Sequence, residues 1–138
     1  MPTSAQYTFE PGTAKLDPIY PNSGARLMNV TLAAATYTRG TILGELTATP
    51  GKYAAYASTN TDGTQVPKGI LQYSCVVDSS GNVTLAGEFG QTQMGVPMYV
   101  GGGAIFDTTQ LTGLDANAVT VMGAALVEGT RGAGQLRF

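Results

Sequence analysis

Few side chains in this sequence of 138 residues are suited to catalysis. Histidine is absent, which removes the commonest general base, the Ser-His and Cys-His nucleophile pairs and the commonest metal ligand. Nine carboxylates and a single cysteine, Cys75, are left. Two carboxylates could hydrolyse a glycosidic bond if the fold held them about 5 to 9.5 Å apart with separated pKa values. Any catalysis by this chain would therefore have to rely on carboxylates alone.

The carboxylates lie mostly beside residues that favour turns. Asp17-Pro18, Asp62-Gly63 and Asp78-Ser79 are such pairs, and aspartate side chains in turns accept hydrogen bonds from nearby backbone N–H groups. The segment from Asp107 to Asp115 lacks the intermediate acidic and amide ligands of a calcium loop. We therefore expect turn and cap roles for the acids, and no catalytic site, no metal site and no cofactor.

Two glycine-containing segments and the single cysteine are further candidates for a site. Gly101-Gly102-Gly103 leads into an apolar run without the Lys-Ser or Lys-Thr of a phosphate-binding loop, and Pro50-Gly51-Lys52 is followed by Tyr53. Neither segment predicts a nucleotide site. Cys75 precedes two valines, so we expect it to be a small buried hydrophobe.

The charge content also limits the partners. Only 12% of residues are charged, compared with about 25% in ordinary soluble domains. The formal net charge is −2 and the seven basic residues are scattered singly, so nothing in the pattern favours nucleic-acid binding. A weakly charged surface tolerates burial against a protein partner. It is equally typical of a β protein rich in threonine and glycine.

No segment predicts insertion into a membrane. The longest apolar runs are far shorter than the roughly 20 residues that span a bilayer, and Met1 to Ser4 do not begin a signal peptide. We therefore expect a soluble protein that is made in the cytoplasm.

The elements that would position any site are mostly strands. The length favours one domain, and strand-forming residues dominate from Arg26 onward, after a turn-prone cluster at residues 22–24. Strands are predicted at residues 27–32, 36–38, 41–46, 52–56, 69–78, 83–85, 96–100 and 118–127.

Loops and one helix separate the predicted strands. Turns are expected at Pro50-Gly51 and at residues 79–82, and loops at residues 58–67 and 88–95. Asp107 is a candidate N-cap for a short helix over residues 108–114, and the glycine-rich tail, residues 128–138, is expected to be mobile or docked on a partner. The pattern predicts a mainly β fold, a small β-barrel or sandwich-like domain (residues 26–138) with one short helix.

Residues 1–25 differ from the rest and predict an extended N-terminal arm. Four prolines in this segment disfavour a helix or a sheet interior. Polar and aromatic residues alternate within the arm as they would in a short strand with one covered face. These residues are Gln6, Tyr7, Thr8, Phe9 and Glu10. Such a segment either adds to the sheet edge of another protein or is a frayed terminus.

Three segments carry a resemblance to a known family. They are GTILGELTATPGKYAAY (residues 40–56), DGTQVPKGIL (62–71) and VPMYVGGGAIF (96–106). Together they resemble the family of the phage lambda head decoration protein, small capsid-stabilising proteins of tailed phages. The resemblance extends from about Gly40 to Val127, which leaves out the arm.

The resemblance implies a structural protein and not an enzyme. Members of that family form homotrimers on the outer surface of the expanded head, at three-fold and quasi-three-fold positions, and hold neighbouring subunits of the major capsid protein together. The implied partners are the major capsid protein and further copies of the chain, with no small-molecule substrate, no nucleic acid and no membrane. The implied location is the virion surface, after synthesis in the host cytoplasm.

Within this hypothesis the arm residues, Gln6 to Glu10, would bind the capsid. This assignment depends on their composition and position, because the arm differs in sequence from that of the lambda family. An alternative is a carbohydrate- or peptide-binding β-module of a phage tail or cell-surface protein, which would use tyrosines as a binding face. The candidate tyrosines are Tyr53, Tyr56, Tyr73 and Tyr99. A carboxylate-only enzyme, with Glu88 or Asp107, is the third hypothesis.

Overall fold

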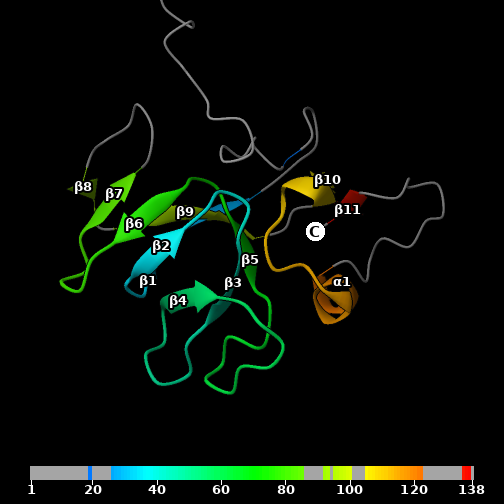
Figure 1. The fold of residues 1–138 in the computed structure, drawn as a ribbon, viewed down its shortest axis with the longest axis horizontal. Coiled ribbons are helices and arrows are strands. Elements are labelled where there is room, and N and C mark those ends of the chain that lie inside the picture. Colours follow the sequence, from blue (N-terminus) through cyan, green and yellow to red (C-terminus); the bar gives the residue numbers. More distant parts are fainter. Residues whose placement is uncertain are drawn as a thin grey trace, which may run out of the picture.

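The computed structural model describes residues 19, 26–85, 92–93, 95–100, 105–122 and 135–137. These residues form a closed five-stranded barrel, a four-stranded sheet and a two-stranded sheet, with one short α-helix on the same side of the barrel as the two-stranded sheet (Figure 1). The predicted mainly β fold with a small barrel and a short helix is confirmed.

The elements follow one another as short strands. They are β1 (Leu27–Leu32), β2 (Ala35–Tyr37), β3 (Ile42–Glu45), β4 (Lys52–Ala55), β5 (Gly69–Leu71), β6 (Cys75–Val77), β7 (Val83–Leu85), β8 (Thr92–Gln93), β9 (Val96–Tyr99), β10 (Ile105–Asp107), a 3₁₀ turn (Thr108–Gln110), α1 (Ala116–Met122) and β11 (Gln135–Arg137).

The barrel follows the order β1, β4, β3, β5, β9 and closes from β9 back to β1. All of its strand pairs are antiparallel except β1 with β4. The predicted reversal at Pro50-Gly51 joins β3 to β4, and Gly51 there has a φ of 90°, which glycine adopts without a steric penalty. The other two sheets are also antiparallel, in the orders β2-β6-β7-β8 and β10-β11.

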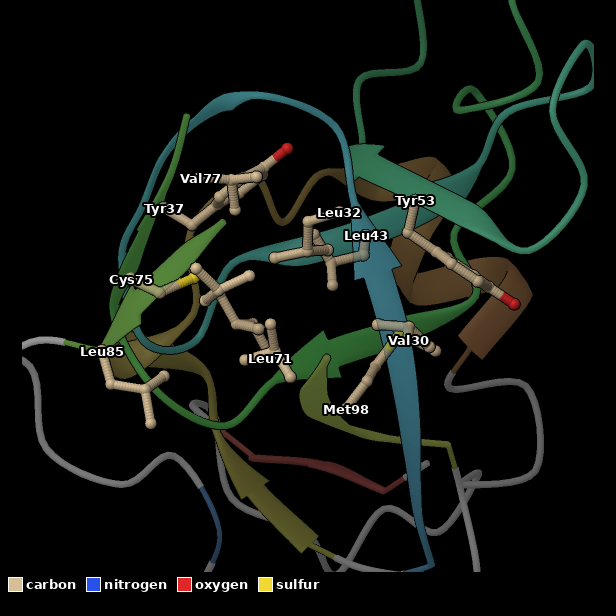
Figure 2. Packing of buried hydrophobic residues seen from close by; sticks show 12 residues of the cluster. Val30, Leu32, Tyr37, Leu43, Tyr53, Leu71, Cys75, Val77, Leu85 and Met98 are labelled. Carbon is tan, nitrogen blue, oxygen red and sulfur yellow. The ribbon is translucent and has the colours of Figure 1, made fainter. Parts of the chain in front are cut away.

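Consecutive residues of the barrel strands pack into two different apolar clusters, because side chains of a strand alternate between its two faces. The barrel cluster lies inside the barrel and under the four-stranded sheet, and includes Leu43, Leu71, Cys75 and Met98 (Figure 2). The outer cluster lies on the opposite face of β3, β5 and β9. Its buried members are Ile42, Tyr56, Ile70, Tyr99, Phe106, Leu111, Ala118 and Met122.

The predicted long strand over residues 69–78 is wrong, because this segment forms two strands in different sheets. β5 belongs to the barrel, whereas β6 pairs with β2 and β7 in the four-stranded sheet. Arg39 holds the connection between them: its Nε donates to the Gln72 carbonyl at 2.8 Å, and its backbone N–H donates to Ser74 Oγ at 2.7 Å. The predicted hairpin that follows, with its turn at residues 79–82, is confirmed as β6–β7.

The predicted last strand over residues 118–127 is also wrong where the structure describes it. Residues Ala116–Met122 form the helix α1. Asp115 begins the helix, since its Oδ1 accepts from the Ala118 N–H at 2.8 Å. Ala118 and Met122, four residues apart, are buried on the same helix face. Helical spacing and the cap therefore override the strand preference of the β-branched residues between them.

Three smaller predictions have mixed outcomes. Asp107 caps a helical turn as predicted, but the turn is a 3₁₀ helix of three residues. The predicted loop over residues 88–95 contains strand β8, and its other residues lie outside the described ones except for Gly95. Part of the tail, β11, pairs with β10 of the same chain, so for these residues the expectation of a mobile or partner-docked segment is wrong.

Candidate functional site

The arm residues predicted to bind a partner are Gln6, Tyr7, Thr8, Phe9 and Glu10, and they lie outside the described residues. The structure describes the arm at Ile19. This residue forms an antiparallel β-bridge with Phe106 of β10, and its partly buried side chain packs against the outer cluster. The arm therefore touches its own domain at Ile19, a contact that the sequence analysis did not predict.

Strand β10 is paired on both of its edges at this contact. Phe106 is the register partner of Leu136 in β11 and also of Ile19. The Phe106 side chain is fully buried, and its ring meets that of Tyr99 edge to face, with the centroids 5.4 Å apart. β10, β11 and α1 lie together on one side of the barrel (Figure 1). The root of the arm is thus held where the two-stranded sheet covers the outer cluster.

The carboxylates within the described ranges all accept hydrogen bonds in turns or at helix starts. Glu45 Oε2 accepts from the Gly51 N–H at 2.8 Å. Asp62 and Asp78 accept from backbone N–H groups two to four residues later in their own loops, and Asp107 and Asp115 accept at the starts of the 3₁₀ turn and α1. The predicted turn and cap roles are confirmed for these residues, while Asp17 lies outside the described part.

Hydrogen bonds lower the pKa of three of these acids. The Thr64 hydroxyl is the main cause for Asp62, the Asn82 backbone N–H for Asp78 and the Tyr56 hydroxyl for Asp115. A lowered pKa keeps each of these three groups ionised at neutral pH. They are therefore poor general acids, and each already accepts hydrogen bonds from neighbouring groups.

The other chemical candidates are buried. Cys75 is 1% exposed, and burial raises the pKa of its thiol to about 11, so it is protonated and inert at neutral pH. The prediction that Cys75 is a buried hydrophobe is confirmed. Tyr53, Tyr56 and Tyr99 are also buried, and Tyr73 packs partly against the barrel cluster. The tyrosines therefore do not form the binding face on which the carbohydrate-binding hypothesis depended.

The exposed surface of the four-stranded sheet carries a row of uncharged side chains. Thr36, Val76 and Thr84 are register partners across β2, β6 and β7, and all three are exposed. Among the described residues, the other exposed large apolar side chains lie outside this sheet: Leu27 and Met28 in β1, Val66 in a loop, and Val119 and Val121 in α1. Exposed apolar residues that are dispersed in this way are normal in soluble proteins and do not define a site.

The described residues form neither a metal-ion cluster nor a membrane-spanning helix. Within the described ranges, no three acidic or cysteine side chains lie close enough together to hold a metal ion. In the same part of the chain, no helix is both long and apolar enough to cross a bilayer.

Comparison with known proteins gives one match. The family model described as "Bacteriophage lambda head decoration protein D" matches residues 22–91, half of the chain. The matched segment begins before β1 and extends past β7. No curated protein and no solved structure matches the chain.

Proposed function

Because the chain belongs to the family of the bacteriophage lambda head decoration protein D, we propose that it binds the outer surface of the expanded phage head as a homotrimer at three-fold and quasi-three-fold sites. There it would link neighbouring subunits of the major capsid protein and stabilise the shell. Synthesis would take place in the host cytoplasm, and the working location would be the virion. The family match over β1 to β7 is the observation that carries this proposal.

The chemistry of the described residues supports a structural role. The described carboxylates are used in turns and caps, and the thiol of Cys75 is buried. The barrel is closed, so its five strands leave no open edge among themselves. A closed barrel with two apolar clusters is a rigid body, which is suited to holding neighbouring subunits at a fixed spacing.

The arm residues Gln6 to Glu10 are proposed to bind the capsid by β-strand addition. In this mode the main chain of an extended peptide pairs with the edge of a sheet, and alternate side chains enter pockets. Tyr7 and Phe9 have the required spacing of two residues. They would fill shallow pockets on the capsid, while Thr8 between them faces away.

Trimerisation would combine the weak affinities of the single arms into tight binding of the whole trimer. Once one arm is bound, the other two are held close to their sites, so their binding becomes intramolecular and the overall affinity rises without any new contact. The proposed trimer therefore requires only modest affinity from each arm.

Deletion of Met1 to Glu10 tests the arm. We expect the shortened protein to keep its trimeric mass and its thermal stability, because the barrel and the two apolar clusters are formed by residues 19–122. We expect it to lose binding to expanded heads that lack decoration protein, measured by co-sedimentation. A double variant, Tyr7→Ser with Phe9→Ser, serves as the milder counterpart, and Gln6→Ser with Thr8→Ser as its matched control. Full binding by the deletion variant would refute the arm proposal.

Mass measurement tests the oligomeric state. Sedimentation of the free protein and cross-linking of the protein on heads should both give a trimer, or the trimer should appear on the head alone. A protein that remains monomeric on heads would refute the trimer while leaving the family assignment intact.

A further inference from the structure

The arm and the C-terminal strand meet on the same strand of the domain. β10 has β11 on one edge and Ile19 on the other, with Phe106 as the register partner of both. These three segments are far apart in the sequence. Their meeting means that the chain upstream of Ile19 starts from β10 and the outer cluster, and not from β1, which begins at Leu27.

We propose that Ile19, Phe106 and β11 form an anchor that fixes the point from which the arm leaves the domain, and that capsid binding depends on this anchor. The inference rests on the proposed capsid-binding role of the arm and adds positioning residues to it. Among the described residues, Ile19 is the member from the arm. The C-terminal strand contributes by covering the opposite edge of β10.

The contacts at Ile19 account for its ability to hold the chain. Its backbone is bridged to β10 and its side chain packs on the outer cluster. Phe106 is fully buried and lies edge to face with Tyr99 of the barrel strand β9. The anchor is thus connected through one aromatic pair to the barrel itself.

The anchor shortens the tether between the domain and the capsid-binding residues. Nine residue steps separate Glu10 from Ile19, whereas sixteen separate Glu10 from Arg26. At about 3.3–3.6 Å per residue, the longest possible reach is about 30 Å from Ile19 and about 55 Å from Arg26. Holding the chain at Ile19 therefore confines the arm to a smaller volume beside β10.

A shorter tether raises the effective concentration of each arm at its site. Because effective concentration falls roughly as the −3/2 power of tether length, release of the anchor lowers it about 2.4-fold per arm, and about sixfold for the second and third arms of a trimer together. The anchor therefore contributes to avidity although it does not contact the capsid.

Substitution of Ile19 tests the anchor in the full chain. Ile19→Asp places a carboxylate against the outer cluster and should release the bridge, whereas Ile19→Leu should preserve it. We expect Ile19→Asp to bind expanded heads about sixfold more weakly, with unchanged trimer mass and melting temperature and with faster hydrogen exchange at the Ile19 and Phe106 amides. A chain that ends at residue 134, without β11, should show the same weakening, and Val121→Ala on the exposed face of α1 should show none.

The outcomes separate the anchor from the arm. If deletion of residues 1–10 abolishes head binding while Ile19→Asp binds as tightly as the unaltered protein despite faster amide exchange, the anchor is overturned and the arm proposal stands. If the deletion leaves binding intact, the arm proposal fails and the anchor fails with it. Weaker binding by Ile19→Asp but not by Ile19→Leu, on an unchanged fold, supports the anchor.

Discussion

The hydroxyl of Tyr56 shows how single polar atoms hold the elements of this domain together. It donates to Asp115 Oδ1 at 2.7 Å and accepts from Asn117 Nδ2 at 3.0 Å, while Asp115 also caps α1. The side chain of Tyr56 lies in the outer cluster. The position of α1 on the barrel therefore depends on one buried phenol and one carboxylate.

The link between Tyr56 and Asp115 predicts a pH-dependent effect of Tyr56→Phe. The pKa of Asp115 in the folded protein is lowered, chiefly by the Tyr56 hydroxyl. Its contribution to stability is therefore present above the ordinary carboxyl pKa and is lost as the pH falls through the lower folded pKa. We expect Tyr56→Phe to reduce the free energy of unfolding by about 1 kcal/mol at pH 7, and by less at pH 3, measured by chemical denaturation.

Tyr37→Phe is the matched control, because the Tyr37 hydroxyl donates to the Ala33 carbonyl, which does not titrate. Its destabilising effect should be similar at pH 7 and pH 3. Equal pH dependence in the two variants would contradict the role of Asp115.

The residue types in the sequence predicted the roles of the acidic side chains better than they predicted which segments meet at the candidate site. An aspartate beside a turn residue indicates a local acceptor, and Asp62 and Asp78 behave in this way. The contact of Ile19 with Phe106 could not be predicted, because it joins residues 87 positions apart. A signal was present: Ile19 is an apolar residue with prolines on both sides, in Pro18-Ile19-Tyr20-Pro21.

At the scale of elements, local patterns identified strands but not their sheets. Residues 69–78 are largely apolar and were predicted as one strand, yet β5 and β6 separate at Gln72 to Ser74. The separation depends on Arg39, a distant residue that binds this connection. Val119, Thr120 and Val121 favoured a strand, whereas the cap at Asp115 and the buried pair Ala118 and Met122 produce a helix.

The packing of the loop over residues 57–68 on β3 predicts a difference between two glycines. A Cβ at Gly44 would lie 2.6 Å from Thr64 Cα, a contact that backbone atoms cannot relieve by a rotamer change. Gly44→Ala should therefore displace the loop and reduce the free energy of unfolding by about 1–3 kcal/mol.

Gly51→Ala is the variant to compare with Gly44→Ala. It has open space around its Cβ position and a φ of 90°, so its cost should be confined to backbone strain of about 1 kcal/mol. Denaturation midpoints of the two variants measure this difference in stability. A milder effect at Gly44 than at Gly51 would show that the loop yields easily.

At the scale of the whole molecule, the described residues are organised around a barrel with apolar packing on both the inner and the outer face of β3, β5 and β9. Leu43 belongs to the barrel cluster and its neighbour Ile42 to the outer cluster, and both side chains are fully buried. In the sequence, this alternation of side chains between the two clusters appears only as a dense apolar run. Of the segments that cover the outer face, α1 was predicted as part of a strand, and no element was predicted for the apolar residues of β10.

The two clusters predict different consequences for two neighbouring substitutions. Ile42→Ala and Leu43→Ala should each reduce the free energy of unfolding by about 2–5 kcal/mol. Ile42→Ala should also speed hydrogen exchange at Phe106 and along α1 under native conditions, because Ile42 shares the outer cluster with them. In Leu43→Ala, the amides of Phe106 and α1 should stay protected relative to the amides of the barrel strands. Identical exchange patterns in both variants would mean that the clusters open together.

The enclosure of β10 between the two ends of the chain has a mechanical consequence. In the proposed complex, a pull on the capsid-bound arm would load the Ile19 bridge before it could reach β1. The bridge can part while the circuit of barrel strands, which closes through β9 and β1 without Ile19, stays whole. The Ile19 bridge would then break before the barrel does, which would lengthen the free part of the arm. The bridge would re-form when the tension falls.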